Sequence, residues 1–246
     1  AACEICGTNN WMSVYQGAIR DGTYGSYRKH SSIGQCKGCG VERLEEDACP
    51  SKSFYETEEY RTKLKAGIDT QSYILEHDHW QFHTLRTIWP SSLRNLKIAD
   101  IGAAGGSLLD CLKGIASKSI AIEPNDLYRK ELKKRGYEVY SYAKDAQNWQ
   151  AKIDFAFSIQ VIEHVNDPVR FLAEIKTLLS PEGKLVVSTP NRNDILFSLL
   201  PGIFPSFFYR TAHRWYFNET TLGSCAKKAG FKIDETRFIH RYGMSN

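Results

Sequence analysis

Hydrophobic and polar positions change their pattern twice along this chain. Residues 1–50 hold short alternating pieces, such as Trp11 to Tyr15, and no convincing helical period. From about Glu56 to Trp89 the pattern is polar and compatible with helix, and Pro90 ends it. From Lys97 short apolar runs alternate with amphipathic helices, which is typical of βαβ units around a parallel sheet. We therefore predict an α/β fold that follows a small N-terminal module and a helical connection.

The pattern also predicts individual elements in the α/β part. Strands are expected at Lys97 to Ile101, Ser119 to Glu123, Tyr137 to Tyr140, Phe155 to Ile159 and Lys184 to Ser188. Helices are expected at Ser107 to Ile115, Asp126 to Arg135, Pro168 to Leu179 and Glu219 to Ala229. Phe231 to His240 looks like a further strand. The apolar segment Ile195 to Tyr209 contains Pro201 and Pro205, which favours an inserted lid or rim over a regular element.

Composition and charge narrow the class of protein. A length of 246 residues suffices for one full-sized α/β domain with an appendage, and a hydrophobic content of 42% excludes a disordered chain. The net charge of +4 is small and spread along the sequence, so we predict no nucleic-acid partner. No apolar stretch is long enough to span a bilayer, so we expect no transmembrane segment and a cytoplasmic protein.

Four of the seven cysteines form two C-x-x-C pairs, Cys3 with Cys6 and Cys36 with Cys39. In a cytosolic protein such pairs predict metal ligands before disulfides. Tetrahedral zinc takes four thiolates and then has no position left for water, so the site would be structural. A module this small needs a bound metal of this kind to fold. Two disulfides or an iron site remain the alternatives.

A small-residue turn follows the strand predicted at Lys97 to Ile101. It runs from Gly102 to Gly106 and leads into a helix, so a ligand can approach backbone amides at the helix N-terminus. The next predicted strand ends at Glu123, about twenty residues on, where a doubly wound fold places a carboxylate for ribose hydroxyls. The pattern predicts a nucleotide-type cofactor site. Solvated acids beside an ordinary turn are the alternative.

The spacing of the glycine-rich motif argues against a dinucleotide cofactor. The turn reads D-x-G-x-A-x-G from Asp100 rather than G-x-G-x-x-G, and residues 153–168 read I-D-F-A-F-S-I-Q-V-I-E-H-V-N-D-P. In these motifs the sequence resembles the class I S-adenosylmethionine-dependent methyltransferases, with Ala104 in place of the middle glycine. The match continues through Phe171 to Asn191. The resemblance implies a doubly wound, Rossmann-like sheet and S-adenosylmethionine as cofactor.

The resemblance also implies which residues contact the cofactor: Asp100, Gly102, Ala104, Gly106, Glu123 and Gln160. The small residues of the turn would lie against the methionine part of the cofactor, with Asp100 near its ammonium group. Glu123 would hold the ribose hydroxyls. Gln160, at the end of the fourth strand, would face the cofactor and the acceptor.

A weaker resemblance concerns the order of the cysteine module and the class I domain along the chain. Zinc knuckles ahead of a class I domain are similar to the layout of nucleotide-sugar and surface-polysaccharide methyltransferases, which implies a sugar-type acceptor. The expected division is a zinc-ribbon-like module at 1–50, a helical linker or cap at 51–94, and a methyltransferase domain at 95–246 with an apolar insertion at 195–214. The class usually ends with two antiparallel strands. Since only residues 231–240 remain for them, we expect the sequence to be part of a longer protein.

Two histidines are candidates for the base that a methyl acceptor needs. His164 follows the fourth predicted strand beside Glu163, although a Glu-His pair here is also common as a loop buttress. His213 follows the apolar insertion, where the resemblance implies a histidine that reaches over the active site, and packing is the alternative. Residues 214–216 carry an arginine and two aromatic rings that suit a sugar or phosphate.

We therefore predict an S-adenosylmethionine-dependent methyltransferase that acts on a small-molecule or carbohydrate acceptor, such as a sugar nucleotide or a surface polysaccharide. One alternative is an NAD(P)-dependent oxidoreductase, which shares the strand, turn, helix and acid. Another is a non-catalytic binding protein in which the zinc module recruits a partner on a degenerate scaffold. The apolar run Ile195 to Phe208 is a plausible homodimer surface.

Overall fold

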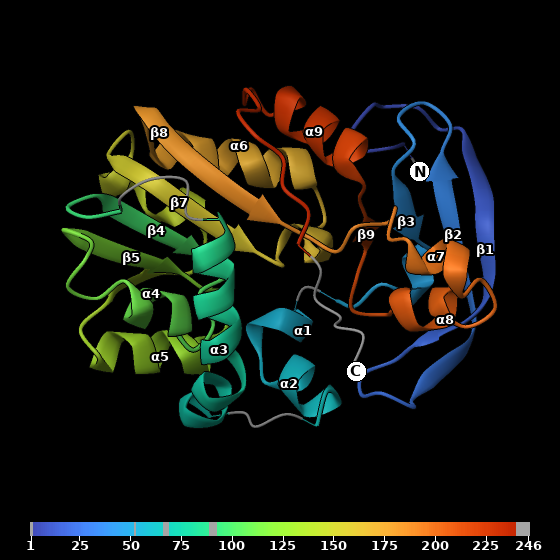
Figure 1. Ribbon diagram of the computed structural model, residues 1–246, viewed down its shortest axis with the longest axis horizontal. Helices are drawn as coiled ribbons and strands as arrows, with labels where there is room; N and C mark the ends of the chain where they lie inside the picture. The colour runs from blue at the N-terminus through green and yellow to red at the C-terminus, as the bar shows by residue number, and fades with distance from the viewer. Residues whose placement is uncertain (1, 52, 66–68, 89–92, 240–246) are drawn as a thin grey trace.

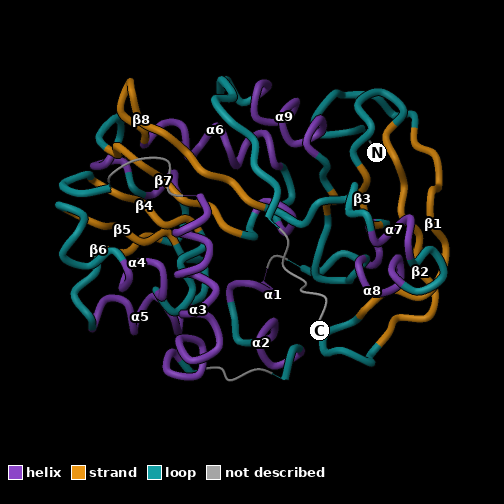
Figure 2. Tube along the Cα trace, in the orientation of Figure 1, coloured by secondary structure: helices purple, strands orange, loops and turns teal. Residues whose placement is uncertain are grey.

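The computed structural model describes residues 2–51, 53–65, 69–88 and 93–239. Two sheets lie at opposite ends of the view in Figure 1, and the helices are arranged around and between them. Figure 2 shows the same arrangement as strand and helix traces. No helix within these described ranges is both long and apolar enough to cross a membrane.

The larger sheet has five strands in the order β6-β5-β4-β7-β8, and every pairing is parallel. The strands are β4 (Lys97–Ile101), β5 (Lys118–Ile122), β6 (Glu138–Tyr140), β7 (Ile153–Ile159) and β8 (Leu179–Ser188). Strand β4 is buried except at its first residue, as expected for a central strand covered on both faces. The predicted α/β fold with a doubly wound sheet is confirmed. The order reverses between β4 and β7, which is where such folds bind ligands.

Helices cover both faces of the five-stranded sheet (Figure 1). On one side lie α3 (Thr70–Ile88), α4 (Ser107–Cys111) and α5 (Asp126–Lys134), and on the other lie α6 (Pro168–Leu178) and α9 (Glu219–Lys228). Side-chain oxygens cap α5 and α6, because Asn125 accepts from two amides of α5 and Asp167 accepts from one amide of α6. Alternate residues of β4 face opposite sides, so Ile98 packs with α4 residues and Ala99 with α6 residues.

The smaller sheet is antiparallel and draws on distant parts of the chain. Its order is β1-β2-β3-β9, with β1 (Trp11–Arg20), β2 (Tyr27–Cys36), β3 (Glu42–Leu44) and β9 (Trp215–Tyr216). Strand β9 begins 171 positions after the end of β3 (215 − 44) yet pairs with it, Glu42 opposite Tyr216 and Arg43 opposite Trp215. The N-terminal module therefore includes a strand from the C-terminal half of the chain.

The predicted lid at Ile195 to Tyr209 forms two short helices, α7 (Leu196–Leu199) and α8 (Phe204–Phe208), which lie against the smaller sheet in Figure 1. Their aromatic rings pack onto that sheet in one cluster with Ile19, Ile33, Leu44, Tyr209 and Tyr216. The opposite side of this segment exposes Ile195, Leu199, Leu200 and Ile203. The expected homodimer surface remains a prediction.

Two sequence predictions need correction. Residues 231–239 form no strand, and their side chains other than Phe231 and Ile239 are exposed. Lys232, Asp234, Glu235 and Arg237 are charged, and Ile233 and Phe238 stay exposed, so the segment buries no apolar face on a sheet. The helix-compatible stretch before Pro90 divides into α1 (Ser53–Glu56), α2 (Glu59–Lys63) and α3. Trp89, Pro90 and His240 lie outside the described residues.

Buried polar contacts join the two sheets. The Glu42 carboxylate on β3 is 3% exposed and accepts hydrogen bonds from Arg192 at 2.7 Å and from the Tyr209 hydroxyl at 2.7 Å. The Trp215 indole on β9 donates to the carbonyl of Val165 at 2.8 Å, just after β7. The smaller sheet therefore holds the loop that follows β7, where His164 lies, and His213 lies just before β9.

Candidate active site

The small-residue turn after β4 adopts the left-handed conformations that glycine favours. Gly102 has a φ of 81°, and a Cβ there would come within 2.5 Å of the Val161 side chain. Gly105 lies under the Tyr73 ring of α3, where a Cβ would come within 2.4 Å. Ala104 has a φ of 43° although it carries a Cβ, a conformation that is strained for alanine. The turn thus has left-handed backbone at Gly102 and Ala104, whereas Gly105 is required by the close approach of Tyr73.

Glu123 follows β5 and lies directly at this turn. One carboxylate oxygen accepts from the Ala104 amide at 2.6 Å and the other from the Asn125 amide at 2.7 Å. The structure therefore brings Glu123 and the turn together, as the sequence predicts. These contacts leave the carboxylate beside the cavity described below, which both Ala104 and Glu123 line.

Asp100 and Glu123 form a buried acidic pair, each 5% exposed. Burial raises the pKa of Asp100 to about 7, with the charge of Glu123 as the second cause. Burial also raises the pKa of Glu123 to about 7, against the opposing effect of the two amides. A cationic ligand beside this pair would be favoured, since it would offset the cost of the buried negative charge.

Gln160 lies at the end of β7, next to the point where the strand order reverses. Its φ is 58°, and its side-chain amide donates to the Ser188 hydroxyl of the neighbouring strand at 3.3 Å. A left-handed backbone at a non-glycine residue is held by its surroundings and is common at functional sites. Gln160 thus lies at the predicted edge of the sheet.

His164 belongs to a short 3₁₀ helix, η4 (Ile162–His164), directly after β7. Its Nδ1 lies 2.7 Å from the carbonyl oxygen of Ala212 and 3.2 Å from the Tyr55 hydroxyl. Because a carbonyl can only accept, the neutral ring carries its proton on Nδ1 and keeps Nε2 as the basic nitrogen. The ring centre of His213 lies 4.9 Å away, so the structure brings the two candidate bases together.

Both histidines are neutral at pH 7. Burial lowers the pKa of His164 to about 4, with a smaller contribution from the positive charge of Arg210. Burial lowers the pKa of His213 well below its usual value, and the charges of Arg210, His164 and Arg20 act in the same direction. Either ring can therefore accept a proton. Glu163, His164 and His213 also place one donor atom each within 4.8 Å of one another, which is a set of ligand types that suits a divalent cation.

One continuous cavity of about 2330 Å³ joins the two sets of candidate residues. The same cavity also extends along β8 and residues 230–239, so only part of its volume adjoins the candidate residues. Its lining includes Gly102, Ala104, Glu123, Gln160, His164 and His213. Asp100 and Gly106 are not among the lining residues, so their contribution is to the electrostatics and to the shape of the turn.

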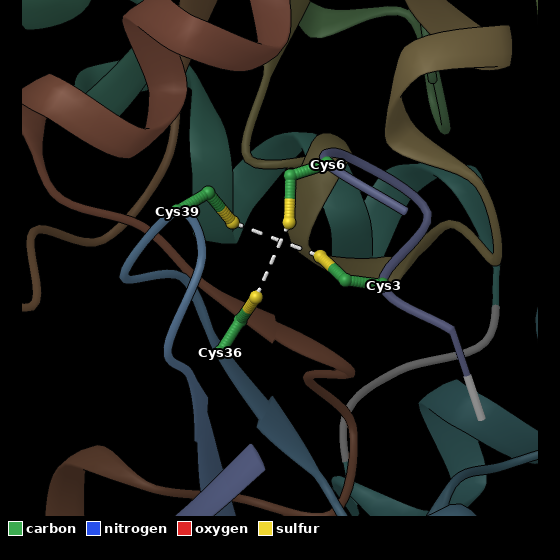
Figure 3. Close-up of side chains that lie close together, drawn as sticks. All are labelled: Cys3, Cys6, Cys36 and Cys39. Carbon is green, nitrogen blue, oxygen red and sulfur yellow. Dashed lines mark hydrogen bonds between the residues drawn. The ribbon is translucent and has the colours of Figure 1, made fainter. Parts of the chain in front are cut away.

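The four paired cysteines converge at one end of the smaller sheet (Figure 3). Cys3 and Cys6 precede β1, Cys36 ends β2, and Cys39 lies in the turn before β3. The Cys3 and Cys39 sulfurs are 3.7 Å apart, and the Cys6 and Cys36 sulfurs are 3.4 Å apart. Tetrahedral Zn–S bonds of about 2.3 Å would separate the sulfurs by about 3.8 Å. The cluster therefore fits a four-thiolate zinc site.

Residues 214–216 are structural, which corrects the expectation that they contact a sugar or phosphate. Arg214 forks onto Glu46 at 2.9 and 2.6 Å, and Trp215 and Tyr216 are at most 2% exposed. Sequence reasoning instead missed Arg20 and Arg210, which line the cavity beside His213. No motif marks these two arginines, and only their place at the ends of apolar segments sets them apart.

The parallel sheet, the turn after β4 and the acid after β5 together define a Rossmann-like domain for an S-adenosylmethionine-type cofactor. The fold is similar to that of a SAM-dependent methyltransferase from Archaeoglobus fulgidus, with a TM-score of 0.52 and 20% identity over 66% of this chain and 72% of that one. Residues 6–236 match the methyltransferase domain family, so the chain belongs to that family. The predicted class, an S-adenosylmethionine-dependent methyltransferase, is confirmed at this level, and an NAD(P)-dependent oxidoreductase is not favoured.

Sequence relatives are named for an O-methyltransferase. The chain is 29% identical over 117 residues to a ubiquinone biosynthesis O-methyltransferase of Dinoroseobacter shibae, which covers 45% of this chain and 47% of that one. It is 26% identical over 165 residues to the protein of that name in Azorhizobium caulinodans, covering 62% of this chain and 64% of that one. The chain thus spans about half to two thirds of these relatives. Their names give no support to a polysaccharide acceptor.

Replacing Asp100 with asparagine tests the buried acidic pair. The folded protein holds the Asp100 proton up to about pH 7, whereas the carboxyl titrates near 4 in the unfolded chain. This carboxyl therefore lowers stability as the pH rises from about 4 to 7. We expect Asp100→Asn to raise the free energy of unfolding by about 1–3 kcal/mol at pH 8 and to leave it nearly unchanged at pH 4, as measured by urea denaturation. The exposed Asp47→Asn is the control, and an equal effect of Asp100→Asn at both pH values would contradict the burial argument.

Proposed function

We propose that this protein transfers a methyl group from S-adenosylmethionine to a hydroxyl of a small-molecule acceptor. The observation that supports it is the single cavity that joins the turn and Glu123 to the histidine pair. The relatives in sequence are named O-methyltransferases, which favours oxygen as the accepting atom. A sugar-type acceptor remains a prediction from the order of the domains.

The residues on the cofactor side fit this cofactor. Bound S-adenosylmethionine supplies an electrophilic methyl group on a positively charged sulfur. The buried acidic pair of Asp100 and Glu123 favours a cation, and the Glu123 carboxylate offers two acceptors to a ribose diol. The left-handed turn at Gly102 and Ala104 lets a ligand approach the backbone closely.

The acceptor side supplies a base and aromatic rings that exclude water from it. A hydroxyl must lose its proton as it attacks, and His164 offers the Nε2 lone pair because Nδ1 is turned to the Ala212 carbonyl. The rings of Tyr55 and Tyr60 lie 5.0 and 5.9 Å from the His164 ring. They exclude water from the imidazole and fix its orientation. We therefore assign the base to His164, with His213 packed against it.

Cofactor binding is tested by isothermal titration with S-adenosylhomocysteine. We expect the wild-type protein to bind it and Glu123→Ala to weaken binding by about 10- to 100-fold, because two charge-assisted hydrogen bonds are lost. Glu59→Ala removes an exposed carboxylate and should change nothing. Failure of the wild-type protein to bind would contradict the proposed function.

The assignment of the base is tested with catechol and 3,4-dihydroxybenzoate as hydroxyl acceptors. We expect His164→Gln to lower kcat by about 10²- to 10⁴-fold while S-adenosylhomocysteine binding stays intact. His213→Gln should lower kcat less, and the exposed His79→Gln on α3 should match the wild-type protein. A larger loss from His213→Gln than from His164→Gln would move the role of base to His213.

We also propose that Cys3, Cys6, Cys36 and Cys39 hold a structural zinc ion. Four sulfur ligands leave the metal no open position, so it would stabilise the module and take no part in methyl transfer. Mass spectrometry of metals should find one zinc per chain. Cys36→Ser should lower that ratio and the thermal stability, while Cys111→Ser, outside the cluster, should keep the zinc. A full set of zinc in Cys36→Ser would contradict this assignment.

A further inference from the structure

Arg210 lies on a rigid turn at the acceptor side of the cavity. The Tyr216 hydroxyl accepts from the Arg210 amide at 3.0 Å and donates to the Arg210 carbonyl at 2.9 Å. The same carbonyl accepts from the His213 amide at 3.1 Å. Tyr216 is 2% exposed, so its hydrogen bonds anchor the backbone of Arg210 to the hydrophobic core. A residue fixed in this way can place its side chain reproducibly.

Arg210 has no acidic partner among the residues that the structure describes. No described carboxylate lies within ion-pair distance of its guanidinium, and its Nε is buried without a hydrogen-bond partner. Two other arginines that line the cavity are paired, Arg61 with Glu76 at 2.8 Å and Arg170 with Glu174 at 2.9 Å. The two carboxylate oxygens of Glu163, next to His164, are closed off from solvent. An uncompensated cation beside neutral rings is costly unless a ligand supplies the opposite charge.

A second arginine lies beside the first. Arg20 at the end of β1 forms a backbone bridge with Arg210, and both residues line the cavity. The Arg20 guanidinium lies 4.4 Å from the centre of the Phe207 ring, which holds it against α8. The positive charges of both arginines reach the same histidine, His213. Two arginines therefore lie on this wall of the cavity, which the buried Glu163 carboxylate also lines.

We propose that Arg210 determines specificity by binding an oxyanion group of the methyl acceptor, such as a carboxylate or a phosphate. A guanidinium forks onto either group with two hydrogen bonds. The anion would rest against Arg210 while a hydroxyl elsewhere on the same molecule faces His164. Tyr55 and Tyr60 offer flat apolar surface to the part of the acceptor in between. This inference rests on the proposed methyltransferase function and adds the chemical class of its acceptor.

The test compares three probes on the full chain loaded with S-adenosylhomocysteine: catechol, 3,4-dihydroxybenzoate and phenyl phosphate. We expect the wild-type protein to bind at least one of the two anionic probes about 10- to 100-fold more tightly than neutral catechol. Tighter binding of 3,4-dihydroxybenzoate would identify a carboxylate acceptor, and tighter binding of phenyl phosphate a phosphate acceptor. Equal affinity for all three probes would overturn the proposal.

Variants assign the effect to Arg210. Arg210→Gln should remove the preference for the anionic probe and leave catechol binding unchanged, while Arg210→Lys should keep part of the preference. Arg86→Gln, on the exposed side of α3 and outside the cavity, is the matched control. The melting temperature of Arg210→Gln should not fall below that of the wild-type protein, because the side chain makes no ion pair to lose. An unchanged preference in folded Arg210→Gln would overturn the proposal, whereas failure of the wild-type protein to bind S-adenosylhomocysteine would overturn the proposed function itself.

Discussion

The pairing of β9 with β3 is the contact on which the acceptor side of the site depends. Trp215 of β9 is fully buried and donates to the Val165 carbonyl, and the Arg214 amide donates to the Glu163 carbonyl at 2.8 Å. The segment that carries His213 is therefore hydrogen-bonded to the smaller sheet on one side and to the loop after β7 on the other. A direct contact adds to this pairing, because the Ala212 carbonyl accepts from Nδ1 of His164 at 2.7 Å.

The two sides of the cavity carry opposite charges that the protein does not neutralise by itself. Asp100 and Glu123 lie on the cofactor side, and Arg210 lies on the acceptor side. Such charges lower the stability of the folded protein, as does the left-handed backbone of Ala104 and Gln160. Strain and unpaired charge collect in a binding site because ligands, rather than protein contacts, offset them. A positively charged cofactor and a negatively charged acceptor would satisfy both sides at once.

Structural features that depend on local spacing could be predicted from the sequence. Strand β4 begins and ends where periodicity places it, the turn and Glu123 meet, and the C-x-x-C pairs converge. Features that depend on distant pairing could not be predicted, because a two-residue strand such as β9 has no periodicity of its own. The same applies to Arg210, because only the fold shows that it lacks an acidic partner among the described residues. The strand predicted at Phe231 to His240 failed because alternating apolar and charged residues resemble a half-buried strand even where no sheet receives them.

The cysteine cluster acts on the site through the smaller sheet. Cys39 ends the turn that begins at Cys36, and Glu42 follows three positions later on β3. Glu42 in turn binds Arg192 and Tyr209, the residue before Arg210. A metal that fixes the turn would thus fix β3, and β3 fixes the segment that carries the acceptor-side residues. The turn after β4 and Glu123 belong to the other sheet, so the N-terminal module supports the half of the cavity that contains the two histidines and Arg210.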